Sequence, residues 1–281
     1  MLKKPRQAKI AELLNVEGEQ SVRHLAETLK VTEMTIRRDL AALAGQGSLL
    51  RTHGGAVPAN RVAFEFEFLK RMRENEGAKQ AIGAAAAKLV ADGSTVMLDS
   101  GTTTLALARY LKAKKGVLVI TTSLPIASML QYSEQNRVLI LGGFLRRDSP
   151  DLGGALTESN LENLHPDMVF LGAEGIDADG GIYSTSLEVA RLLTKMAAAA
   201  KEVYVLADHS KLDRTSLTRY GNLCQWKGII TDKGADARFV AKLRKAGGRV
   251  IIAGETSLEQ FDELRDNSPA PVQSGKKSAT D

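Results

Sequence analysis

The fold of the first 57 residues is decided by the stretch Val31-Thr32-Glu33-Met34-Thr35-Ile36-Arg37-Arg38-Asp39-Leu40 and by Arg51-Thr52-His53-Gly54-Gly55-Ala56, which follows it. Ile36, Leu40 and Leu43 recur at spacings of four and three, so they fall on one side of a helix. The Gly-Gly pair lies among apolar residues within Ser48–Val57, which is typical of a two-stranded hairpin. The two stretches therefore predict a helix followed by a short hairpin.

Two shorter helices are expected before this one. The first has an apolar stripe and ends at Gly18. Ser21 can accept a hydrogen bond from the free N–H groups at the start of the second helix, as Thr32 can for the third. Residues 1–57 therefore predict a small domain of three helices and a hairpin.

The outer side of the third helix, opposite its apolar stripe, carries two arginines, a hydroxyl and a small residue. Arginine can pair with guanine or with phosphate, and threonine can meet a base edge, so this side suits the major groove of double-stranded DNA. The hairpin would act as a wing on the neighbouring backbone. The expected DNA-binding residues are Thr32, Met34, Thr35, Arg37, Arg38, Arg51 and His53.

The alternative is that Arg37 and Arg38 form an ordinary solvated helix face. The order of helices, turn and Gly-Gly hairpin favours the DNA interface. Charge agrees, because Lys and Arg outnumber Asp and Glu by nine to six in residues 1–57, while the whole chain has a net charge of +5. A mildly basic balance permits nucleic-acid binding without proving it.

The whole chain of 281 residues has globular composition, with 43% hydrophobic and 25% charged residues. Its single cysteine, Cys224, excludes an internal disulfide and is interpreted as a packed thiol. No apolar stretch approaches a membrane span or a signal peptide, so we expect a cytoplasmic protein that does not enter a membrane. The four histidines lack metal-ligand spacing, and no metal site is expected.

Beyond the first domain, short apolar runs alternate with helical segments, a pattern that predicts an α/β domain with a mostly parallel sheet covered by helices on both faces. The expected strands are Thr95–Leu98, Val117–Ile120, Val138–Leu141, Met168–Leu171, Val203–Leu206, Gly228–Ile230 and Val250–Ile252. The expected helices are 103–112, 124–131, 186–199 and 235–246.

Polar loops follow several of these strands, at the ends where parallel sheets bind ligands. Glycine lets the backbone approach a ligand, and helix N-termini offer free N–H groups to an anion. Hydroxyls, carboxylates and one lysine around such a cradle indicate a small polyol phosphate. The expected ligand-binding residues in these loops are Asp99, Ser100, Gly101, Thr102, Thr103, Thr104, Thr121, Thr122, Ser123, Gly142, Gly143, Asp208, Ser210 and Lys211.

Each loop taken alone would more often be a simple helix cap, and the shared site is favoured only because four loops follow successive strands. The chain has neither a P-loop nor a Gly-x-Gly-x-x-Gly turn between a strand and a helix, so no nucleotide cofactor is expected. We expect domain boundaries at 1–57 and 77–254, a linker at 58–76 and a disordered tail at 266–281, where large apolar groups are scarce.

The chain resembles the DeoR family of bacterial transcription regulators. The resemblance rests on Thr-Ile-Arg-Arg-Asp-Leu with the His-Gly-Gly-Ala wing, on Asp99-Ser100-Gly101-Thr102-Thr103, and on Asp208-x-Ser210-Lys211. It implies a winged helix-turn-helix, a sugar-phosphate sensor domain with the fold of ribose-5-phosphate isomerase, operator DNA as partner, and a homo-oligomer (dimer or tetramer). One departure is Thr122, where the family more often has Asn.

The implied isomerase fold makes an enzyme the alternative, such as an isomerase or deaminase with a DNA-binding appendage. Of the residues that ribose-5-phosphate isomerases use, Glu188 is retained and is a candidate ligand-binding carboxylate, but Leu171 and Asp179 occupy the positions of an essential Asp and Lys. Isomerisation needs a base and a cation at the enediolate. We therefore expect a pocket that binds without turnover, in a repressor controlled by a phosphorylated sugar.

Overall fold

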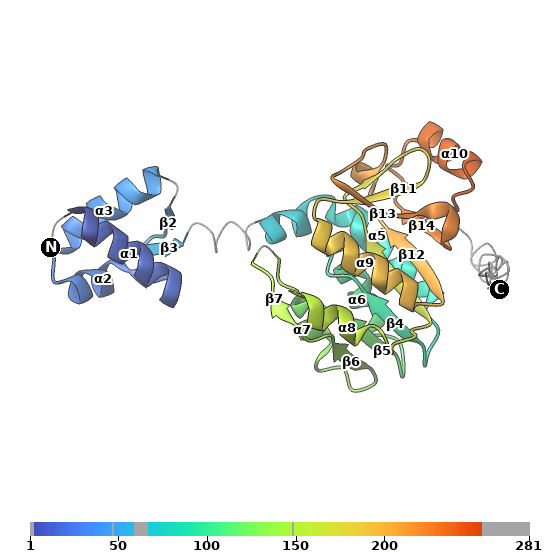
Figure 1. Cartoon of the computed structure of the whole chain (residues 1–281), viewed down its shortest axis with the longest axis horizontal. Helices are drawn as coiled ribbons and strands as arrows, with labels where there is room; N and C mark the ends of the chain where they lie inside the picture. Colours follow the sequence, from blue (N-terminus) through green and yellow to red (C-terminus); the bar gives the residue numbers. More distant parts are fainter. Residues whose placement is uncertain (1–2, 47, 59–66, 148, 255–281) are drawn as a thin grey trace, which may run out of the picture. The chain divides into compact units, whose positions relative to one another are not determined.

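The computed structural model describes residues 3–46, 48–58, 67–147 and 149–254. The described residues form two compact units, one within Met1–Glu74 and Arg146–Pro150, the other within Asn75–Leu145 and Asp151–Asp281 (Figure 1). In the described part of the chain, no helix is both long enough and apolar enough to cross a membrane.

The first unit contains the expected three helices and hairpin. Its helices are α1 (Lys3–Glu17), α2 (Val22–Leu29) and α3 (Glu33–Gly45), and its strands are β1 (Gln20–Ser21), β2 (Leu49–Arg51) and β3 (Gly55–Pro58). Ser21 caps α2 by accepting from the N–H of His24, and Thr32 caps α3 by accepting from that of Thr35. The predicted winged helix-turn-helix is therefore confirmed.

The core of this unit is built from the apolar stripes of the three helices, and Ile10, Leu25 and Ile36 are fully buried within it. The prediction of two strands was incomplete, because β1 adds a third in the order β1-β3-β2. β1 has only two residues, too few to show an alternating pattern. Gly55 lets β3 approach it, since a Cβ there would collide with the carbonyl of Gln20.

The second unit is built on a seven-stranded sheet in the order β15-β14-β12-β9-β4-β5-β6, in which every pairing is parallel. All seven predicted strands are present, with ends shifted by at most one residue. They are β4 (Thr95–Leu98), β5 (Leu118–Thr121), β6 (Arg137–Ile140), β9 (Met168–Gly172), β12 (Glu202–Leu206), β14 (Gly228–Thr231) and β15 (Val250–Ile252).

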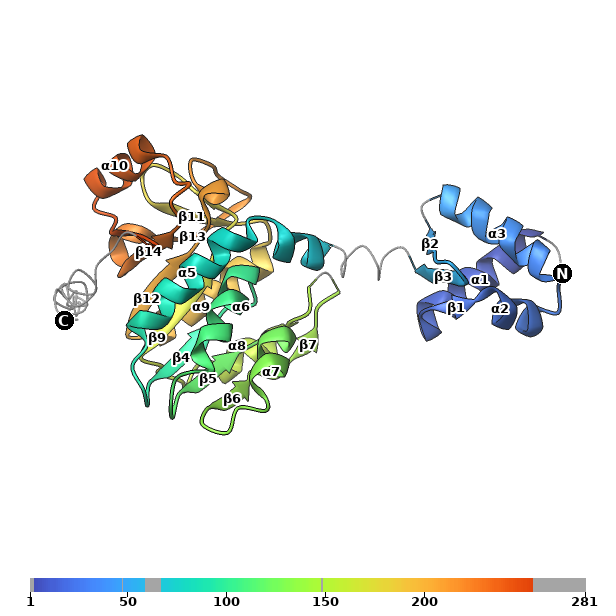
Figure 2. The ribbon, with the colours of Figure 1, turned by 180° about the vertical axis from the view of Figure 1, so that it is seen from behind.

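Helices cover both faces of this sheet, with α5 and α6 packed together on one face and α9 on the other (Figures 1 and 2). The four predicted helices are present, and α5 and α8 were not expected. The bounds are α5 (Glu76–Leu89), α6 (Thr102–Leu111), α7 (Leu124–Leu130), α8 (Ala155–Asn160), α9 (Leu187–Ala199) and α10 (Ala237–Lys245).

Two smaller sheets were missed by the sequence analysis. One is antiparallel, in the order β10-β11-β13, and the other is the hairpin of β7 and β8. Their strands are β7 (Phe144–Leu145), β8 (Leu152–Gly153), β10 (Gly175–Ile176), β11 (Gly181–Ser184) and β13 (Thr218–Asn222), and two short 3-10 helices span His209–Lys211 and Leu223–Gln225. Most of these segments are too short to carry a periodic signal.

Two expectations about the connecting and terminal segments fall largely outside the described residues. The expected tail, 266–281, is not described, and neither is 59–66 of the expected linker. Residues 67–73, also within that linker, are helical.

Gly83 offers a test of the α5–α6 packing. A Cβ on Gly83 would lie 2.7 Å from the backbone of Ala106 and Leu107, whereas one on the exposed Gly77 would meet nothing within 4 Å. We expect Gly83→Ala to lower the free energy of unfolding by about 1–3 kcal/mol, because the helices must separate. Gly77→Ala should be neutral or raise it by about 0.5–1 kcal/mol. Chemical denaturation of both variants measures this, and equal stabilities would contradict the packing.

Candidate functional site

The outer face of α3 presents the residues expected to contact DNA. Met34, Arg37 and Arg38 are exposed, and Arg37 forms a loose pair with Glu33 (Nη2–Oε2, 3.4 Å), one helical turn away. The hydroxyls of Thr32 and Thr35 lie 2.9 Å apart. On the wing, Arg51 and His53 are also exposed. This face is therefore cationic and unobstructed by other described parts of the first unit.

Asp39, which lies next to these arginines in sequence, is buried and has a structural role. Its carboxylate accepts hydrogen bonds from Arg6 (Nε–Oδ2, 2.6 Å) and Gln7 (Nε2–Oδ1, 3.1 Å), and only 2% of the residue is exposed. A buried charge is stable only when it is paired and hydrogen-bonded. Asp39 thus ties α1 to α3 and holds the outer face of α3 in place.

The second cluster begins at Asp99, where β4 ends. The Asp99 carboxylate is partly buried and accepts hydrogen bonds from the N–H groups of Ser100 (2.6 Å) and Gly172 (3.0 Å). Burial raises the pKa of Asp99 above its ordinary value, and the two backbone hydrogen bonds oppose that shift. The loop after β4 and the end of β9 are therefore joined through one carboxylate.

Asp151 is a second carboxylate at this place, it is buried, and it was not among the expected ligand-binding residues. It accepts a hydrogen bond from the hydroxyl of Ser100 (2.7 Å) and forms a β-bridge with Ser123. It immediately precedes β8, and the N–H of Leu152 donates to the carbonyl of Thr122 (3.0 Å). The hairpin of β7 and β8 therefore brings a carboxylate to the loops that follow β4 and β5.

Tyr220 connects Asp99 with the loop that follows β9. Its hydroxyl donates to the carbonyl of Gly172, and its pKa is raised by burial and by the carboxylates of Asp99 and Glu174. Glu174 in turn pairs with Lys211 (Oε2–Nζ, 2.8 Å), and both side chains are partly exposed. Lys211 therefore lies in the same cluster as Asp99, as expected, but a carboxylate already neutralises it.

Several of the expected ligand-binding hydroxyls are used within the fold. Thr104 donates to the carbonyls of Asp99 and Gly101 (2.7 Å each), and Thr121 donates to that of Leu98 (2.9 Å). Ser123 caps α7. These hydroxyls shape the loops, and the donor hydrogens of Thr104 and Thr121 are not free for a ligand.

The N-terminus of α6 offers donors in their place. Gly101 precedes the helix and has no side chain with which to cap it, and Thr102 and Thr103 occupy the first turn. The Gly142-Gly143 turn has a packing role, since a Cβ on Gly143 would collide with the hydroxyl of Thr157. Glu188 is exposed in the first turn of α9, and no described hydrogen bond or ion pair joins it to the cluster.

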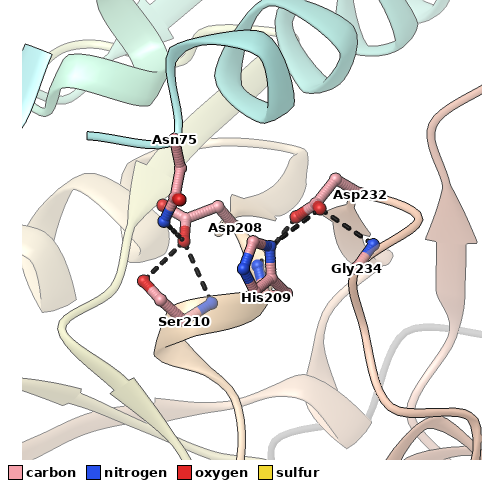
Figure 3. A network of polar contacts seen from close by, with 6 residues as sticks. All are labelled: Asn75, Asp208, His209, Ser210, Asp232 and Gly234. Carbon is pink, nitrogen blue, oxygen red and sulfur yellow. Dashed lines mark hydrogen bonds and ion pairs between the residues drawn. The ribbon is translucent and has the colours of Figure 1, made fainter. Parts of the chain in front are cut away.

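The loop after β12 forms a polar network with the start of α5 (Figure 3). One oxygen of the buried Asp208 carboxylate accepts from Asn75 (Nδ2–Oδ1, 2.9 Å) and from both the N–H and the hydroxyl of Ser210 (3.0 and 2.6 Å). Asn75 has a left-handed backbone conformation (φ 51°). Asp208 thus fixes Ser210 and the residue at which α5 begins.

His209, also in this loop, faces the loop that follows β14 (Figure 3). Its N–H and its ring Nδ1 both contact the carboxylate of Asp232, at 2.7 and 2.9 Å. Although burial acts to raise it, the pKa of Asp232 is lowered, because the carboxylate also accepts from the N–H of Gly234. His209 therefore anchors the loop after β12 to the loop after β14.

Comparison with known proteins assigns both units to one family. The family model of the DeoR-like helix-turn-helix domain matches residues 6–62, and that of the DeoR C-terminal sensor domain matches residues 74–233. Together they cover most of the chain. The members of this family are transcription regulators, so the alternative of an enzyme with a DNA-binding appendage is not supported.

Curated relatives agree over nearly their full length. The chain is 35% identical to the HTH-type transcriptional regulator GlpR of Haloferax volcanii (89% of this chain, 98% of the relative) and 34% identical to the transcriptional repressor AccR of Agrobacterium fabrum (88% and 96%). It is 31% identical to the glycerol-3-phosphate regulon repressor of Escherichia coli K12 (79% and 88%).

Among solved structures, the ribose 5-phosphate isomerase A of Methanocaldococcus jannaschii is similar with a TM-score of 0.37 and 22% identity, over 49% of this chain and 55% of that one. The assignment rests on the family models and curated relatives. The chain belongs to the DeoR family of DNA-binding transcriptional regulators.

Proposed function

We propose that this regulator represses an operon of sugar metabolism. A phosphorylated sugar, bound at the C-terminal ends of the parallel strands, controls its affinity for operator DNA. The observation that carries the proposal is the meeting of two carboxylates, the partly buried Asp99 and the buried Asp151, with Lys211 and the start of α6 in one cluster. The protein acts as a homo-oligomer, and the outer face of α3 and the wing contact the operator.

The phosphate group would be held by the N–H groups at the start of α6 and by Lys211. A helix N-terminus favours an anion through its dipole and its unpaired donors. Lys211 can turn toward a phosphate because its ammonium is partly exposed, but Glu174 competes for it at 2.8 Å. Phosphate binding therefore requires the exchange of one ion pair for another.

The sugar hydroxyls would be recognised by carboxylates. Ser100 donates from its hydroxyl to Asp151 (2.7 Å) and from its N–H to Asp99 (2.6 Å), so both carboxylates lie beside this residue. A carboxylate has about four acceptor positions, and those left over can accept from the hydroxyls of a polyol. This arrangement discriminates against ligands that carry phosphate without neighbouring hydroxyls.

The network around Asp208 supports coupling between this cluster and the rest of the chain. Asp208 holds Ser210, which neighbours Lys211, and it also holds Asn75, the first residue of the second unit. A ligand that moves Lys211 would therefore act on the residue at which the chain enters this unit. Allosteric control needs such a link between two sites with different ligands.

Substitution of the α3 arginines tests the DNA face. We expect Arg38→Ala and Arg37→Ala to weaken binding to an operator selected from random DNA by about 1–3 kcal/mol where a base contact is lost. Loss of a phosphate contact would instead reduce, by about 1, the steepness with which the logarithm of the binding constant falls with the logarithm of the salt concentration. Lys9→Ala is the control, because it removes one charge from α1, where Lys9 is exposed and pairs with Glu12.

Fluorescence anisotropy titrations over a range of salt concentrations give both quantities. The assignment of the outer face of α3 is wrong if both arginine variants match the wild type in affinity and in slope. It is also wrong if Lys9→Ala lowers affinity as much as they do.

Substitution of either partner in the Lys211–Glu174 ion pair should change the affinity for a phosphorylated sugar, and the two substitutions should act in opposite directions. Lys211→Ala should weaken binding of a phosphorylated sugar by about 10–100-fold, since a charge-assisted hydrogen bond is lost. Glu174→Gln should strengthen it several-fold, because the ammonium no longer has a charged competitor. Calorimetric titration with a panel of pentose and hexose phosphates measures both.

Lys201→Ala is the matched control, because Lys201 pairs with Asp167 next to the opposite, N-terminal ends of the strands. With a sugar phosphate that releases the operator from the wild type, Lys211→Ala should hold the operator at the same concentration. Equal affinity of the ligand for the wild type and both cluster variants would place the binding site elsewhere.

A further inference from the structure

One side of the α/β unit exposes an unusual density of large apolar side chains. Of the ten that are most exposed in the described part of this unit, seven come from residues 124–156, although these residues are a small part of it. The seven are Leu124, Tyr132, Leu139, Ile140, Phe144, Leu145 and Leu156. We call them the β6 surface, because they lie on β6 and on the elements that flank it.

The centre of this surface is β6, the last strand of the sheet. Its outer edge has no neighbouring strand among the described residues, and Arg137, Leu139 and Ile140 are all exposed. Edge strands are normally protected by charged residues, bulges or a covering segment. β6 has one charged residue, Arg137, at its first position. At the opposite edge, β15 is better covered, with Ile251 buried.

The flanking elements continue the apolar character of β6. A groove of about 660 Å³ runs between α7 and β6 and is lined by apolar residues such as Leu130 and Ile140 together with polar ones such as Gln131 and Arg137. The Phe144 ring lies beside Gly154, which directly precedes α8. If Gly154 carried a Cβ, that atom would be 3.4 Å from the Cδ2 of Phe144. The ribbon views place β6, β7, α7 and α8 at the same end of the unit (Figures 1 and 2).

The size of this surface matches that of a stable protein interface. With a fully exposed aromatic side chain at about 150–250 Å² and Leu or Ile somewhat below that, the seven side chains expose on the order of 700 Å². Each partner of a standard interface contributes about 800 Å². Apolar patches larger than a few hundred Å² are uncommon on monomeric proteins and mark sites of interaction.

We infer that the β6 surface binds a second copy of this chain, and this inference rests on the proposed function, in which the protein acts as a homo-oligomer. A helix-turn-helix protein commonly reads two half-sites with two copies related by a twofold axis. A twofold axis brings the same edge strand of two copies together in opposite directions. Two copies of β6 could then form backbone hydrogen bonds with each other as an antiparallel pair.

The test places a carboxylate on this edge. Ile140→Glu should weaken self-association of the full chain by about 100-fold or more, because it would place two symmetry-related carboxylates in an interface made largely of apolar side chains. Phe144→Glu should act in the same direction and cannot disturb the core, because Phe144 is 79% exposed. Leu217→Glu is the matched control, because Leu217 is 72% exposed and lies outside the β6 surface.

Sedimentation equilibrium measures the association constants, and circular dichroism checks that each variant is folded. Loss of association in Ile140→Glu or Phe144→Glu, with Leu217→Glu unchanged, supports the inference. A monomeric wild type would overturn it, and so would association that persists in both folded β6-surface variants. Greater loss in Leu217→Glu would place the interface elsewhere and overturn it as well.

The inference and the proposed function fail separately. If the wild type is a monomer that still binds operator DNA and sugar phosphates, the β6 surface is wrong and the proposed function stands. If the wild type associates through the β6 surface but no sugar phosphate changes its affinity for DNA, the inference stands and the effector proposal is wrong.

Discussion

The position of β4 between β5 and β9 is the constraint on which the second unit depends. Leu98 pairs with Phe170 on one side and with Thr121 on the other, both in parallel register. Because all three strands therefore end at one edge, Asp99 can accept from the N–H of Gly172 and lie beside the loop that contains Ser123. The cluster is a consequence of this register, and a shift of one residue would reverse the side chains that face it.

The strands and helices could be predicted because their signals are local. The seven strands of the parallel sheet are short runs that are largely buried on both faces, except at the edge strands β6 and β15. The caps Ser21 and Thr32 act within three residues of their own position. Strands of two residues could not be predicted, since two residues define no period. The same holds for the hairpin of β7 and β8.

The candidate site could be predicted only in part, for a physical reason. The loops that contain Asp99 and Lys211 could be predicted to lie near each other, because a parallel sheet collects the loops after its strands at one edge. Asp151 was missed because its contact with Ser100 spans 51 residues and depends on a hairpin with no sequence signal. Thr104 and Thr121 were assigned to the ligand from their hydroxyls, but the structure uses those hydroxyls to hold backbone carbonyls.

The central claim is that a phosphorylated sugar at this edge and operator DNA at α3 oppose one another. Thermodynamic linkage makes the effect reciprocal, so the affinity for the sugar phosphate must fall by the same factor when operator is bound. The direct measurement is calorimetric titration of the free and the operator-bound protein with the sugar phosphate that releases the operator. The account predicts a weaker affinity in the operator-bound protein, by about 5–150-fold. Equal affinity in the two titrations would contradict it.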